Sequence, residues 1–151
     1  NSTRESVIAS LDTNFNSQVP VYTQNKVYFP PTDRTIMTTD EGVDRFLIID
    51  NLLRINLESQ KNMLEDKSLL SYLFVYQAYE DNKLSSQSLK KQVAQKRAQE
   101  LYSQKWQEIS QNYRMDYLVI GPNDLKSARP DAYFLKPVTS INGYIIMKYA
   151  K

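Results

Sequence analysis

The chain has 151 residues, enough for one domain with a sizeable hydrophobic core, and it contains neither cysteine nor histidine. Their absence excludes cysteine and histidine nucleophiles, a histidine general base, and zinc sites built on either residue. Nineteen basic against seventeen acidic side chains leave a net charge of only +2. This balance is too even for the concentrated basic face that nucleic-acid binding needs, so we expect no nucleic-acid partner.

The N-terminal region is expected to be rich in β structure. Residues 6–11 are short, apolar and bounded by polar residues, which is typical of a first strand. Residues 12–17 have the composition of a turn-rich loop, and residues 19–22 and 26–29 predict two further strands. The prolines within and after these strands cannot donate ladder hydrogen bonds, so the strands are expected at a sheet edge.

Three helices are expected in the middle of the chain. The first begins near Thr38, whose spacing to Glu41 is that of a capping box. Its apolar face carries residues that recur at three- and four-residue steps, namely Phe46, Ile49, Leu53 and Leu57. The second and third helices are expected over residues 68–79 and 86–113.

The C-terminal region predicts the centre of the sheet. Residues 117–120 are apolar on both faces, as in a central strand that is covered on both sides. Residues 123–137 predict an irregular segment that covers the sheet edge, and residues 143–149 predict a closing strand nearer that edge. The predicted fold is a single α/β domain over residues 1–151, a three-layer-like small sheet of about five strands flanked by three helices.

No catalytic motif is found in the chain. The glycines number only three and are scattered, whereas phosphate-binding loops need clustered glycines so that the backbone can approach the phosphate. The sequence therefore predicts no catalytic residue, no cofactor and no metal site.

A candidate ligand site lies where two of the predicted strands end. Open α/β sheets bind ligands beyond the carboxyl ends of their strands, because the loops there are free to present polar groups. The residues at these two strand ends are Ser10, Asp12, Gly121, Asn123 and Asp124. The same residue types also form ordinary turns, and this structural interpretation stays open as the alternative.

Eleven tyrosines bear on binding as well. A tyrosine ring packs while its hydroxyl stays hydrated, which suits faces that bind sugars or proteins. Five of them fall in the expected β segments or loops, namely Tyr22, Tyr28, Tyr133, Tyr144 and Tyr149. Core packing is the alternative interpretation for these side chains.

Several segments resemble the C-terminal soluble domain of polytopic membrane glycosyltransferase-like proteins of the dolichyl-phosphate-mannose-dependent type. In such domains a helix leads into a strand similar to residues 115–122, and an irregular loop and a closing strand like residues 142–149 follow. Residues 6–11 are similar to the opening strand. The chain departs from the pattern after Thr23, where Gln24 replaces the usual glycine.

The resemblance implies a non-catalytic domain on the extracytoplasmic face of the cell membrane, periplasmic or extracellular, within a larger membrane protein. Its partners would be the membrane-embedded part of its own chain and a lipid-linked sugar or an acceptor whose recognition it assists. The family's catalytic carboxylates lie in the membrane part, so no catalytic residue carries over.

Two alternatives remain open from the residues themselves. One is a free-standing ligand- or protein-binding module, such as an exported lipoprotein or a regulatory α/β domain. The other is an enzyme in which Asp12 and Asp124 hold Mg²⁺ through their oxygen atoms.

Overall fold

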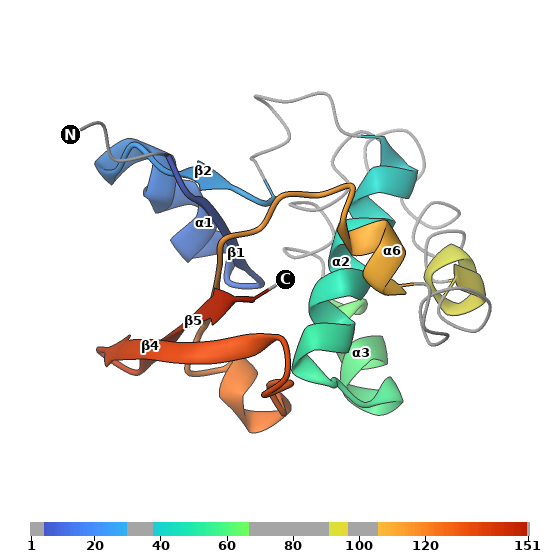
Figure 1. Ribbon diagram of the computed structural model, residues 1–151. Coiled ribbons are helices and arrows are strands. Elements are labelled where there is room, and N and C mark those ends of the chain that lie inside the picture. Colours follow the sequence, from blue (N-terminus) through green and yellow to red (C-terminus); the bar gives the residue numbers. More distant parts are fainter. Residues whose placement is uncertain (1–4, 30–37, 67–90, 97–105, 151) are drawn as a thin grey trace.

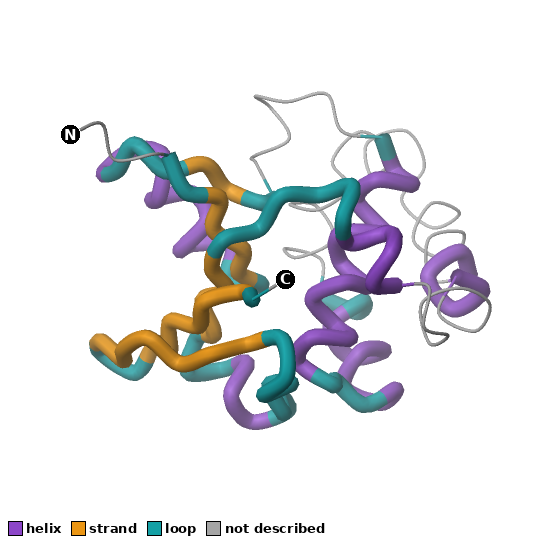
Figure 2. The backbone as a smooth tube through the Cα atoms, viewed as in Figure 1, coloured by secondary structure: helices purple, strands orange, loops and turns teal. Residues whose placement is uncertain are grey.

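The computed structural model describes residues 5–29, 38–66, 91–96 and 106–150. Its sheet has the strand order β2-β1-β3-β5-β4. The strands are β1 (Val7–Ser10), β2 (Lys26–Val27), β3 (Tyr117–Ile120), β4 (Leu135–Ile141) and β5 (Tyr144–Tyr149). β2, β1 and β3 run parallel, whereas β3, β5 and β4 pair antiparallel. Figures 1 and 2 show this mixed sheet with helices beside it, which confirms the predicted α/β fold.

Helix α1 (Thr13–Tyr22) joins β1 to β2 and corrects the expected structure of this region. Residues 12–17 were expected to form a loop and residues 19–22 a strand; both lie instead in α1 and its N-cap. The N-cap is Asp12, whose carboxylate accepts a hydrogen bond from the backbone N–H of Phe15 at 3.0 Å. This cap satisfies a donor that the first turn of a helix otherwise leaves free.

The apolar, proline-containing end of α1 explains why it resembles a strand in sequence. Val19 and Val21 are β-branched, and Pro20 between them lacks a backbone N–H. Pro20 nevertheless lies in the last turn of α1, and the helix ends two residues later at Tyr22. The buried amide of Asn16 donates to the Ser10 carbonyl at 2.8 Å, a tertiary contact that fastens α1 to β1.

Helix α2 (Thr39–Leu53) begins as the sequence predicts. The hydroxyl of Thr38 accepts from the backbone N–H of Glu41 at 3.2 Å, so Thr38 is the N-cap. Glu41 also pairs with Arg45 one turn later at 2.7 Å. Arg45 lies between two aromatic rings, 5.1 Å from the centroid of Tyr28 and 5.1 Å from that of Tyr113. These contacts fasten the first turns of α2 to Tyr28, which follows β2, and to Tyr113, which precedes β3.

The end of α2 lies earlier than the apolar stripe suggested. Arg54 closes the helix in the left-handed conformation, at a φ of 49°. Leu57 was expected on the buried face but starts a separate helix, α3 (Leu57–Met63), and is 53% exposed. The stripe from Phe46 to Leu53 is buried as predicted.

The hydrophobic core lies between α2 and one face of the sheet. The fully buried apolar side chains of α2 are Val43, Phe46, Leu47, Ile48, Ile49, Leu52 and Leu53. The sheet contributes alternate residues to the same cluster, namely Ala9, Leu118, Ile120, Met147 and Tyr149. Trp106 of α6 (Trp106–Ser110) packs against this cluster too. On the other side of the sheet, Phe15 of α1 stacks near Tyr144, with ring centroids 5.8 Å apart. Helices therefore cover both faces.

β4 is a further element that the sequence analysis missed, and it forms a hairpin with the predicted strand β5. Residues 123–137 were expected to be irregular, but β4 begins at Leu135. Asn142 and Gly143 both have positive φ, 50° and 83°, as a two-residue type I′ turn requires. β4 forms the edge and β5 lies next to it, nearer the edge than the central β3, as predicted.

The remaining expected elements are met in part. β3 is central and buried, as predicted. β2 lies at the opposite edge, as expected, but ends at Val27 instead of residue 29. The helix expected over residues 68–79 lies outside the described residues. Of the helix expected over residues 86–113, the structure describes helical turns at 91–96 and in α6, and a turn after α6. None of the helices in the described residues is long and apolar enough to cross a membrane.

The burial of Phe46 gives a direct test of this packing. We expect Phe46→Ala to lower the free energy of unfolding by about 3–5 kcal/mol, because it leaves a cavity between α2 and the sheet. The control Leu57→Ala removes an exposed side chain and is expected to cost at most about 0.5 kcal/mol. Urea denaturation followed by circular dichroism measures both. Equal losses in the two variants would contradict the assigned core.

Candidate functional site

The candidate site lies where β1 and β3 end side by side. The two strands are parallel neighbours, with Ser10 paired to Val119, so their carboxyl ends meet at one edge of the sheet. From β1 the chain passes through α1 to β2 on one side, whereas β3 lies on the other side of β1. The strand order therefore reverses between β1 and β3. Such reversal points leave a crevice in which open α/β sheets bind ligands.

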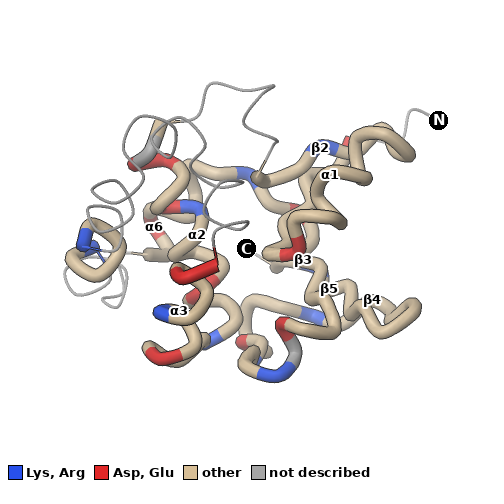
Figure 3. The backbone as a smooth tube through the Cα atoms, turned by 180° about the vertical axis from the view of Figure 1, so that it is seen from behind, with Lys and Arg blue, Asp and Glu red and all other residues tan. Residues whose placement is uncertain are grey.

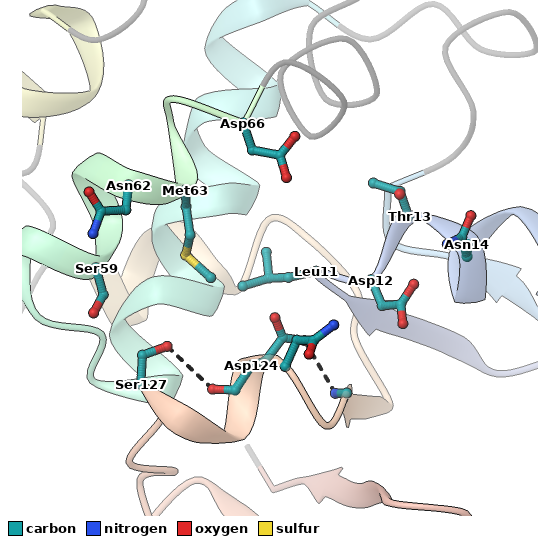
Figure 4. Close-up of a pocket in the computed structure, with 12 residues that line it drawn as sticks. Leu11, Asp12, Thr13, Asn14, Ser59, Asn62, Met63, Asp66, Asp124 and Ser127 are labelled. Atoms are coloured by element: carbon teal, nitrogen blue, oxygen red, sulfur yellow. Dashed lines mark hydrogen bonds between the residues drawn. The ribbon is translucent and has the colours of Figure 1, made fainter.

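A cavity of about 540 Å³ occupies this position. Its residues from the β1–α1 junction are Leu11, Asp12, Thr13 and Asn14. Those from α3 and the residues after it are Ser59, Asn62, Met63 and Asp66. Those from the segment after β3 are Gly121, Asn123, Asp124 and Ser127. Figure 4 shows the α3 side chains on one side of the cavity, Thr13 and Asn14 on the opposite side, and Asp124 between them.

The structure brings the predicted site residues together. Asp12, Gly121, Asn123 and Asp124 all line the cavity. Ser10 does not; it is fully buried beneath them, and its hydroxyl accepts from the backbone N–H of Asp12 at 3.1 Å. Ser10 therefore positions the β1–α1 junction. Ligand binding by these residues stays a prediction.

The wall formed by α3 was not predicted. Ser59 and Asn62 lie on a helix about fifty residues from Asp12 in sequence, and only the tertiary packing places them opposite it. No local motif marks them. Thr13 and Asn14 are a different case: an N-cap assignment for Asp12 would have placed both in the first turn of a helix facing the strand ends.

Both carboxylate oxygens of Asp12 accept hydrogen bonds within the fold. One oxygen caps α1 through the Phe15 N–H, and the other accepts from the hydroxyl of Tyr144 at 2.9 Å. The Tyr144 bond ties the β5 strand to the β1–α1 junction across 132 residues of sequence. The same bond raises the pKa of Tyr144.

Asp124 faces Asp12 across Gly121. The Asp124 carboxylate accepts from the backbone N–H of Gly121 at 3.2 Å. A Cβ atom added at Gly121 would lie 3.2 Å from an oxygen of Asp124 and 3.5 Å from one of Asp12. Burial raises the pKa of Asp124, the Gly121 N–H lowers it, and the negative charge of Asp12 raises it again. The two carboxylates are thus close enough to influence each other.

The cavity is acidic and polar. Its described lining contains three aspartates and neither lysine nor arginine. Helix α1, which lies beside the cavity, carries no charged residue along its length, as Figure 3 shows from behind. Hydroxyls of Thr13, Ser59 and Ser127 and amides of asparagines complete the polar lining, with Leu11 and Met63 as apolar members. Among the described residues, no group of three acidic side chains is placed to hold a metal ion.

The five tyrosines do not form one binding platform. Tyr28 and Tyr149 are buried in the core, whereas Tyr22 and Tyr133 are 80% and 78% exposed. Tyr144 is half-buried, and its hydrogen bond to Asp12 holds it beside the cavity. Core packing is therefore correct for two of the five.

Comparison with protein-family profiles, with curated proteins and with solved structures finds no match to this chain.

The coupling between the two carboxylates predicts a measurable pKa change. Asp12→Asn removes the negative charge, and asparagine still caps a helix well. We therefore expect the pKa of Asp124 to fall in this variant, since one of the influences that raise it is gone. Carboxyl ¹³C shifts followed through an NMR pH titration report it. An unchanged pKa would show that the two carboxylates do not face each other in solution.

Proposed function

We propose that this domain is a non-catalytic binding domain that holds a sugar unit in the crevice between the ends of β1 and β3. The observation that carries the proposal is the cavity of about 540 Å³ at the point where the strand order reverses. This volume suits a small molecule, since ligand pockets commonly span roughly 300–1,000 Å³.

The lining suits a ligand with many hydroxyl groups. The carboxylates of Asp12 and Asp124 accept hydrogen bonds from hydroxyls, and the amides of Asn62 and Asn123 both donate and accept. Met63 and its apolar neighbour Leu11 offer a surface for the C–H face of a sugar ring. A mixed wall of this kind fixes orientation through its polar groups.

The wider context is proposed from sequence resemblance. Residues 115–122 and 142–149 are similar to the C-terminal domains of membrane glycosyltransferase-like proteins. This supports a place on the extracytoplasmic face of the membrane, with the membrane-embedded part of the same chain as partner and a lipid-linked sugar or acceptor as ligand. The domain would assist recognition, and catalysis would belong to the membrane part. A free-standing binding module, exported or regulatory, would use the same crevice without that partner.

Asn62 provides a test of sugar binding. Its side chain is exposed on α3 and lines the cavity. We expect Asn62→Ala to weaken hexose binding by about fivefold, the effect of losing roughly one hydrogen bond. Asn112→Ala, at an exposed turn away from the cavity, is the matched control and should bind as the parent protein does. Isothermal titration calorimetry with a panel of neutral hexoses measures both. Absence of binding by the parent protein across the panel contradicts the proposal.

The gene itself tests the membrane context. We expect the coding sequence upstream of Asn1 to encode several apolar segments, each of the roughly 20 residues that span a bilayer. Sequencing that region decides the matter. A short export signal alone, or a cytosolic start, would favour the free-standing module and leave the crevice proposal intact.

A further inference from the structure

The two strand ends at the crevice carry backbone N–H groups of the kind that bind phosphate in many α/β proteins. One is in the first turn of the helix that follows β1, where free N–H groups and the helix dipole attract anions. The other belongs to Gly121, directly after β3. In this protein each of these donors is already bonded to a carboxylate of the chain.

Asp12 accepts the hydrogen bond of the N–H group at the start of α1. Its Oδ1 accepts from the Phe15 N–H at 3.0 Å, and its negative charge lies at the positive end of α1. The carboxylate of Asp12 therefore lies where an anion bound at this end of α1 would have to lie.

Asp124 accepts the hydrogen bond of the Gly121 N–H group. Its Oδ2 accepts from the Gly121 N–H at 3.2 Å. The same oxygen would lie 3.2 Å from a Cβ at Gly121, so it covers the face on which a phosphate would approach the glycine backbone. A third carboxylate, Asp66, also lines the cavity.

From this geometry we infer that the crevice rejects phosphate and other anionic groups and admits the uncharged, hydroxyl-bearing part of its ligand. Asp12 and Asp124 are the residues that determine this selectivity. The inference rests on the proposed function for the identity of the ligand as a sugar.

Neutral hexoses and their 6-phosphate esters test the selectivity directly. We expect the parent protein to bind the neutral sugar at least about tenfold more tightly than its ester, because the ester's charge would lie beside two carboxylates. The ratio should shrink as salt screens the charges. Equal or tighter binding of the ester would overturn the inference.

Two double variants distinguish the effect of the negative charges from the effect of the hydrogen bonds that the carboxylates accept from the backbone N–H groups. Asp12→Asn with Asp124→Asn removes both charges but keeps an acceptor on each N–H. Asp12→Gly with Asp124→Ala removes the charges and also frees the N–H groups, and glycine remains an acceptable N-cap. We expect inorganic phosphate to bind the Gly/Ala pair at least about tenfold more tightly than the parent protein and the Asn pair. Calorimetry measures binding, and thermal melts confirm folding.

The outcomes distinguish the inference from the proposed function. If no hexose binds the parent protein but phosphate binds the Gly/Ala pair alone, the sugar proposal fails and the anion selectivity stands. If phosphate binds the parent protein at this site, or binds neither pair, the assigned role of the two carboxylates is wrong. Should the Gly/Ala pair not fold, the single variant Asp124→Ala leaves the α1 cap intact and carries the same comparison with Asp124→Asn.

Discussion

The parallel pairing of β1 with β3 is the constraint on which the crevice depends. It places Ser10 beside Val119, so the chain leaves both strands at the same edge and Asp12 reaches the neighbourhood of Gly121. A shift of one residue would turn every side chain of β1 to the opposite face. The register is held because β1 and β3 each bury residues on the α2 face, among them Ala9 and Leu118. The hydrophobic core thus fixes the geometry of a polar site.

Asp12 shows how one residue can serve the fold and the crevice together. It caps α1, accepts from the hydroxyl of Tyr144, and faces Asp124 across Gly121. These contacts join the β1–α1 junction, the hairpin strand β5 and the segment after β3. The carboxylates are therefore held in place before any ligand arrives, which lowers the entropy cost of binding. Partial burial disfavours the ionised form of Asp124 and so raises its pKa.

Sequence alone predicted the centre of the sheet and the start of α2, because each has a strong local signal. It also placed Asp12 and Asp124 at the ends of two strands, and both line one cavity in the structure. It failed over residues 19–22, where β-branched residues around Pro20 suggested a strand. There the Asp12 cap and the Asn16 contact with Ser10 override local propensity. It also missed β4, although Asn142-Gly143 between apolar segments is a good hairpin signal. The α3 wall of the cavity could not be predicted, since it arises only from tertiary packing.

Amide chemical shifts provide the most direct test of whether a sugar binds at the ends of β1 and β3. In ¹⁵N-correlated NMR spectra recorded during titration with a neutral hexose, we expect shifts that cluster at Gly121, Asn123 and Phe15. These amides lie on or beside the cavity and include both donors held by the carboxylates. Shifts confined instead to exposed tyrosines such as Tyr22 and Tyr133 would place binding elsewhere and contradict sugar binding in the crevice.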